Sequence, residues 1–104
     1  MKIQFNTDKT ISGEERQEEF FSNQIAKELD RFNAHITRIE VHLSDENGKK
    51  EGINDIHCLL EARLEGLKPI VAKDQAGSVA ASVAGATSKL KAALTTTLGK
   101  MQKH

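Results

Sequence analysis

The sequence predicts an α+β fold in which one four-stranded sheet is covered on one face by two helices, in the order β-α-β-β-β-α. Three observations support this two-layer sandwich. Four short segments alternate apolar with polar residues, which is typical of half-buried strands. Two longer segments repeat apolar residues at helical spacing, and a chain of 104 residues has the length of one domain. Because one sheet with two helices on one side buries all of these apolar faces, we expect a single domain over residues 1–104.

The first strand and the first helix are predicted in the first third of the chain. The strand covers residues 2–6, where Ile3 and Phe5 share one face, and its short length is typical of an edge strand. The helix follows at about residues 13–32, with Ser12 as the expected N-cap. Its buried stripe is expected to consist of Phe21, Ile25, Leu29 and Phe32.

Three further strands are predicted at residues 38–43, 56–65 and 69–73. The connections between them are short, so we expect antiparallel hairpins. One face of these strands is apolar, and the other is expected to be solvated, with charges of both signs. The residues expected on the solvated face are Arg38, Glu40, His42, His57, Glu61, Arg63 and Glu65.

The second helix is predicted at about residues 76–101. Small residues crowd its first half and let it lie close to the sheet, although Gly85 costs about 1 kcal/mol of helix stability relative to alanine. At about 100° per residue, Lys91 lies on the opposite flank from the other lysines. The buried stripe is expected to consist of Val79, Val83, Ala86, Leu90, Leu94, Thr97 and Met101. The exposed edge beside it is expected to carry Lys89, Thr96, Lys100 and Lys103.

Charge is divided unevenly along the chain. Residues 77–104 hold four lysines and no aspartate or glutamate, whereas residues 1–76 hold 11 basic and 15 acidic residues, a net charge of 11 − 15 = −4. Such a division indicates a surface for an anionic partner. The alternative is a solvated helix whose C-terminal lysines interact favourably with its own dipole.

The sequence has no complete catalytic or metal-binding motif. Asp45 could begin a calcium loop, but Lys49 and Lys50 stand where the EF-hand pattern needs an oxygen ligand and glycine. Residues 85–89 lack the glycine and lysine order of a phosphate-binding loop. We therefore predict that the protein is not an enzyme, uses no cofactor or metal ion, and has no small-molecule substrate.

The single cysteine, Cys58, excludes an internal disulfide and is expected in the core, on the opposite sheet face from His57. The first nine residues contain no apolar signal-peptide core, and no stretch of about 20 apolar residues occurs in the chain. These features predict a cytoplasmic protein without a membrane partner.

Three segments together resemble a known family. They are residues 36–43 with the acidic Asn-Gly turn that follows, residues 61–70, and residues 78–90, which end in Lys89-Leu90. In combination with the β-α-β-β-β-α order, they resemble the family of the ribosome hibernation-promoting factor and ribosome-associated inhibitor A, also called the sigma-54 modulation protein family. The resemblance covers nearly the whole chain and is to the short form of the family. The two-layer arrangement is also similar to that of double-stranded-RNA-binding domains.

The resemblance implies binding to the small ribosomal subunit, in the channel used by messenger and transfer RNA, and hence regulation of translation or ribosome hibernation under stress. It also implies that basic side chains contact the phosphates of ribosomal RNA. Lys89 matches the family pattern directly, while other lysines of the second helix would act as substitutes. The predicted RNA contacts are Lys89, Lys91, Lys100, Lys103 and, on the sheet, Arg38.

Two features depart from that pattern. Ala92 and Thr96 stand where the family usually has basic residues, three and seven positions after Lys89. The helix at residues 13–32 has three basic and six acidic residues, a net charge of 3 − 6 = −3, which would repel RNA. The alternative function is therefore a protein-interaction module that has kept the fold and lost the RNA site.

Overall fold

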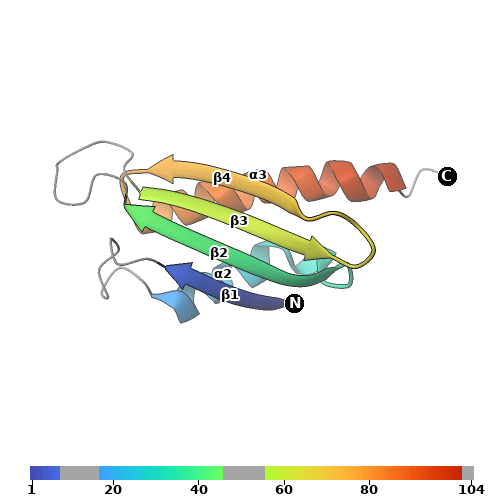
Figure 1. Ribbon diagram of the computed structural model, residues 1–104, viewed down its shortest axis with the longest axis horizontal. Helices are drawn as coiled ribbons and strands as arrows, with labels where there is room; N and C mark the ends of the chain where they lie inside the picture. Colours follow the sequence, from blue (N-terminus) through green and yellow to red (C-terminus); the bar gives the residue numbers. More distant parts are fainter. Residues whose placement is uncertain (8–16, 46–55, 102–104) are drawn as a thin grey trace.

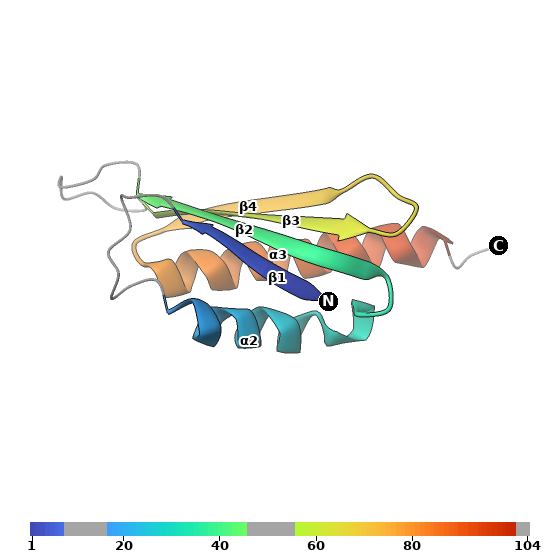
Figure 2. The ribbon, with the colours of Figure 1, turned by 60° about the horizontal axis from the view of Figure 1, so that its bottom comes forward.

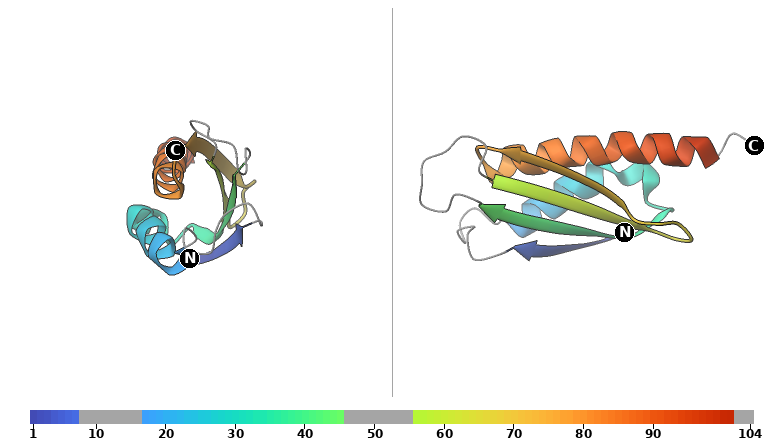
Figure 3. Two further views of the ribbon diagram at one scale, coloured as in Figure 1. Left: turned by 90° about the vertical axis from the view of Figure 1, so that its left-hand side faces the viewer. Right: turned by 45° about the horizontal axis from the view of Figure 1, so that its top comes forward.

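A computed structural model describes residues 1–7, 17–45 and 56–101, with side chains described up to residue 99. The predicted α+β architecture is confirmed: one four-stranded sheet carries both long helices on the same face (Figures 1 and 2). An end-on view shows the sheet curving around the two helices (Figure 3). The elements are β1 (Lys2–Thr7), α2 (Glu18–Glu28), the 3-10 helix η1 (Asp30–Phe32), β2 (Ile36–Asp45), β3 (Ile56–Leu64), β4 (Ile70–Ala76) and α3 (Val79–Met101).

The strands lie in the order β1-β2-β3-β4. β2, β3 and β4 pair antiparallel, as the short connections predicted. β1 is an edge strand, also as predicted, and it pairs parallel to β2. The parallel pairing follows from the intervening helix, because a strand that continues through a crossover helix returns to the sheet in the same direction.

The core between the sheet and the helices is almost entirely aliphatic. The inward residues of β2 and β3 alternate with outward polar ones, as the period-two pattern predicted, and Cys58 lies in the core at 0% exposure. The largest fully buried side chains are Ile25, Leu29, Ile39, Val41, Leu43, Leu60, Val83, Leu90 and Leu94. This core aligns α3 along β4 and β3, so it determines where the lysines of α3 emerge at the surface.

The limits of several elements differ from the prediction. Within the described residues α2 begins at Glu18, because Gln17 adopts a left-handed conformation with φ of 31°; the predicted N-cap Ser12 lies outside the described residues. The predicted stripe on this helix is correct, but its last residue, Phe32, belongs to η1. β4 extends to Ala76, beyond the predicted end at Lys73, and this extension places Asp74 beside α3.

The buried stripe of α3 is correct as far as Leu94 and wrong at the next turn. Leu98 is buried there, whereas the predicted Thr97 is only half-buried. A leucine buries more apolar surface, and it has no hydroxyl that would need a hydrogen-bond partner. The two buried hydroxyls that α3 does have, Ser82 and Thr87, donate to carbonyls of the preceding helical turn at 2.9 and 2.7 Å.

Candidate nucleic-acid interface

Two predicted RNA contacts, Lys89 and Lys91, emerge on opposite flanks of α3, as their angular positions predicted. Lys89 reaches toward β4, where its Nζ lies 2.9 Å from Asp74 Oδ1 and 3.4 Å from the backbone carbonyl oxygen of Lys73. Lys91 reaches toward α2, where its Nζ lies 3.5 Å from Glu28 Oε2. Each lysine therefore already has a carboxylate partner within the chain.

The ion pair of Lys89 and Asp74 is the more closely packed of the two. Its lysine side chain is 59% exposed, but the Asp74 side chain is only 25% exposed. Asp74 fits against α3 because Gly85 has no side chain: a Cβ added at Gly85 would overlap the Asp74 carboxylate. The specific role of Gly85 is thus to leave room for Asp74, which the sequence pattern did not predict.

The pKa of Asp74 is lowered, mainly because its carboxylate accepts the hydrogen bond from Lys89. A carboxyl group whose pKa is lower in the folded state stabilises the fold above its unfolded pKa, and this contribution is lost as the pH falls. We expect Asp74→Asn to lower the free energy of unfolding at pH 6, and the difference from wild type to shrink below about pH 4. Urea unfolding between pH 6 and pH 3 measures this difference.

Glu65→Gln is the control, because it removes an exposed carboxylate that has no ion-pair partner among the described residues. Its stability difference from wild type should stay small across the same range. An Asp74→Asn difference that did not change with pH would show that the pair contributes through shape rather than charge.

Lys91 lies in a more open environment, and Arg31, a cation that is not among the predicted RNA contacts, lies near the same helix. The side chains of Lys91 and Glu28 are 42% and 51% exposed. One turn further along α3, Thr95 accepts a hydrogen bond from Arg31, whose guanidinium also lies 4.6 Å from the centre of the Phe32 ring. The side chain of Lys100 and all of Lys103 lie outside the described part of the structure.

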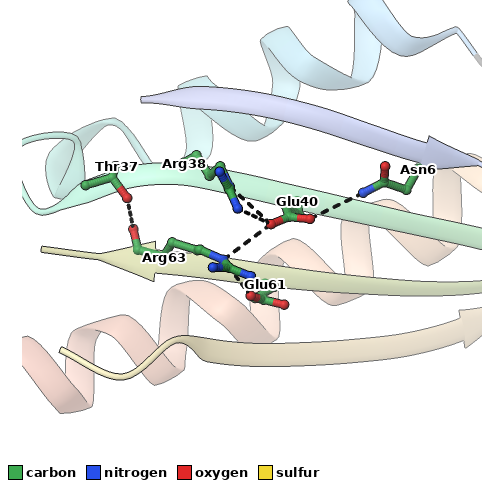
Figure 4. A network of polar contacts seen from close by, with 6 residues as sticks. All are labelled: Asn6, Thr37, Arg38, Glu40, Glu61 and Arg63. Atoms are coloured by element: carbon green, nitrogen blue, oxygen red, sulfur yellow. Dashed lines mark hydrogen bonds and ion pairs between the residues drawn. The ribbon is translucent and has the colours of Figure 1, made fainter.

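Arg38 lies on the outer face of the sheet, away from α3, within a network of charges (Figure 4). Its guanidinium is 2.9 Å from Glu40 Oε2, and the Nε of Arg63 lies 3.3 Å from the same oxygen and 2.8 Å from Glu61 Oε2. The hydrogen bond from Arg38 lowers the pKa of Glu40. Two arginines and two glutamates balance here, as the predicted mixture of charges on this face implied. The structure does not bring Arg38 together with Lys89 and Lys91, the two lysines of α3 whose side chains are described.

Comparison with known proteins identifies the family. The sequence profile described as Sigma 54 modulation protein / S30EA ribosomal protein matches residues 3–102, nearly the whole chain. The chain belongs to this family. The resemblance found in the sequence is therefore confirmed, and the protein is a ribosome-associated factor of the hibernation and translation-regulation class.

A solved structure also has this fold. The crystal structure of the Thermus thermophilus Protein Y N-terminal domain superposes with a TM-score of 0.61 at 14% sequence identity, covering 90% of this chain and 96% of that chain. At this identity the likeness shows the fold alone. No curated protein sequence matches the chain significantly.

Three further features of this S30EA family member concern metal binding, the cysteine thiol and membrane crossing. The described residues contain no group of three or more histidine, cysteine, aspartate or glutamate side chains placed to hold a metal ion. Burial, together with the nearby Asp74 charge, raises the pKa of the Cys58 thiol to about 12, so the thiol stays protonated at neutral pH. In the same described part of the chain, no helix combines the length and apolar character that crossing a membrane requires.

Proposed function

We propose that this chain binds the small ribosomal subunit through ribosomal RNA in the messenger and transfer RNA channel, and that it thereby modulates translation or ribosome hibernation. The observation that carries the proposal is the acid-free helix α3, which presents exposed lysines on both flanks in a member of a ribosome-associated family. The role is one of binding rather than catalysis, and a ribosomal partner implies a cytoplasmic location.

The internal carboxylate partners of Lys89 and Lys91 are compatible with this role. Exposed ion pairs contribute only about 0–1 kcal/mol each, because water and salt screen them. An RNA phosphate can therefore replace Asp74 or Glu28 at small cost, while the carboxylates hold the lysine side chains near the surface until RNA arrives. If all four lysines of residues 77–104 contact phosphates, binding should weaken by about 10²-fold between 50 and 200 mM salt.

The test is co-sedimentation with purified small ribosomal subunits at 50 and 200 mM salt. The variant Lys89→Gln, Lys100→Gln should bind more weakly than wild type, and its binding should weaken only about 10-fold over this salt range, since two of the four phosphate contacts are lost. Glutamine is preferable to glutamate at position 89, because a glutamate would face Asp74 and disturb the fold.

The matched control is Lys27→Gln, Lys68→Gln. It removes the same charge from two exposed lysines on α2 and on the β3–β4 turn, neither of which has an ion-pair partner among the described residues. Equal weakening in both double variants would mean that only the overall charge matters. Absence of wild-type binding at both salt concentrations would contradict the proposal.

A protein-interaction role is the second candidate, and one observation favours it. Phe20 on α2 is 59% exposed and follows Glu18 and Glu19, so this helix presents an aromatic ring beside acidic groups. Such a surface fits a basic protein better than it fits RNA. Capture of proteins from a lysate that persists after ribonuclease treatment and is lost in Phe20→Ala would support this role.

A further inference from the structure

The outer face of the sheet has a second group of polar and cationic side chains, at the end where β2 and β4 finish and β3 begins. Strand register places His42, Leu59 and Lys73 in one row across three strands, and Ser44, His57 and Gln75 in the next. Alternate residues of a strand share a face, so these six side chains form one block. We call the five polar members, His42, Ser44, His57, Lys73 and Gln75, the outer-face patch.

The outer-face patch borders a hollow of about 590 Å³ that also extends to α3. Besides the patch and Leu59, its described lining includes Cys58, Asp74 and Lys89. Lys89 belongs to it because its Nζ approaches the backbone carbonyl of Lys73 at the edge of β4. The hollow thus connects the outer face to the predicted RNA contact on α3.

The polar groups around the hollow suit an anion. The only carboxylate among its described lining residues is Asp74, which is paired with Lys89. The next row of the sheet has Glu40 and Glu61, but both are engaged by arginines. Lys73 has no carboxylate within ion-pair distance among the described residues, in contrast to Lys89 and Lys91. An anion can therefore bind Lys73 without breaking an existing ion pair.

We infer that the outer-face patch binds a phosphate group of RNA, so that the contact begun by α3 continues around the edge of β4 onto the outer face of the sheet. This inference rests on the proposed function. The ammonium group of Lys73, the imidazoles of His42 and His57, and the Gln75 amide are donors for phosphate oxygens. Leu59, half-buried between them, offers an apolar contact to a ribose or base, and single-stranded RNA binds by this combination of phosphate and base-face contacts.

The test compares two charge reversals in the same hairpin, Lys73→Glu and Lys68→Glu. Both lysines are exposed and undergo the same change of charge, but only Lys73 borders the hollow. Binding to small ribosomal subunits is measured at several salt concentrations. Lys73→Glu should weaken binding about 10-fold and reduce the slope of log affinity against log salt by about one, whereas Lys68→Glu should leave the slope unchanged. If the two charge reversals weakened binding equally, or if Lys73→Glu had no effect, the inference would be overturned. Binding by the wild-type protein would still support the proposed function in that case.

A second measurement remains decisive if the wild-type protein does not bind subunits. Isotope-labelled protein is titrated with a short single-stranded oligoribonucleotide and, separately, with inorganic phosphate, and the amide resonances of His57, Leu59 and Lys73 are followed by NMR. Saturable shifts with the oligonucleotide that are lost in Lys73→Glu support an RNA phosphate site. Shifts with inorganic phosphate alone would assign the patch to free phosphate and overturn the RNA inference. The absence of shifts with both probes would also overturn the RNA inference.

Discussion

Replacing Leu90 by alanine is expected to lower the free energy of unfolding by about 2–5 kcal/mol. Leu90 is fully buried in the middle of α3, within the cluster that joins both helices to the sheet. Truncating it removes its transfer free energy and leaves a cavity that the surrounding rigid strands can fill only in part. Because a domain of this size has a total stability of about 5–15 kcal/mol, the loss should be plain in a urea unfolding curve.

The control for this substitution is Leu67→Ala, on the turn between β3 and β4, where the side chain is 37% exposed. Its effect should be within about 0.5 kcal/mol of wild type. If Leu90→Ala were equally mild, α3 would not be packed on the sheet through this residue, and the positions assigned to Lys89 and Lys91 on its flanks would also be wrong.

Replacing Gly85 by alanine is expected to have opposite effects in two backgrounds. In the otherwise wild-type chain the new methyl group overlaps the Asp74 carboxylate and forces it away from Lys89, so stability should fall. In an Asp74→Ala background that space is empty, and the higher helix propensity of alanine should raise stability by about 1 kcal/mol. A double-mutant cycle measured by urea unfolding should give a coupling free energy of about 2 kcal/mol between positions 85 and 74.

Gly99 provides the matched control within the same helix, because a Cβ added there meets no atom of the described residues within 4 Å apart from its chain neighbours and its own helix backbone. Gly99→Ala should therefore leave the free energy of unfolding unchanged or raise it. The size of this effect should be the same in the wild-type chain and in the Asp74→Ala background. A coupling near zero between Gly85 and Asp74 would mean that the carboxylate moves aside freely, and that the ion pair does not depend on the missing side chain.

Some of the candidate interface could be predicted from local sequence. The angular spacing of α3 correctly predicted that Lys89 and Lys91 leave the helix on opposite flanks, since helical rotation per residue is nearly constant. Arg38 was correctly expected on the solvated face, because alternation assigns strand residues to faces. The same alternation, continued one residue past the predicted end of β4, would have revealed Asp74 beside α3.

The partners of these side chains were not predictable in the same way. Lys89 meets a carboxylate 15 residues earlier in the chain, and Lys91 meets one 63 residues earlier. Glu40 joins Arg38 with Arg63 only because β2 and β3 pair in one particular register. These contacts depend on how elements are placed relative to one another, and local periodicity carries no information about that placement.

Spacing along the chain and the motifs within it were therefore enough to predict the order of the elements, most of their buried faces, the two-layer architecture and the family. Three features emerged from tertiary packing alone: Asp74 and Glu28 pair with Lys89 and Lys91, Gly85 makes room for the first of these pairs, and residues from three strands surround one hollow. A side chain's charge is a local property, whereas its neighbours follow from strand register and from the way the core packs α3 against β4.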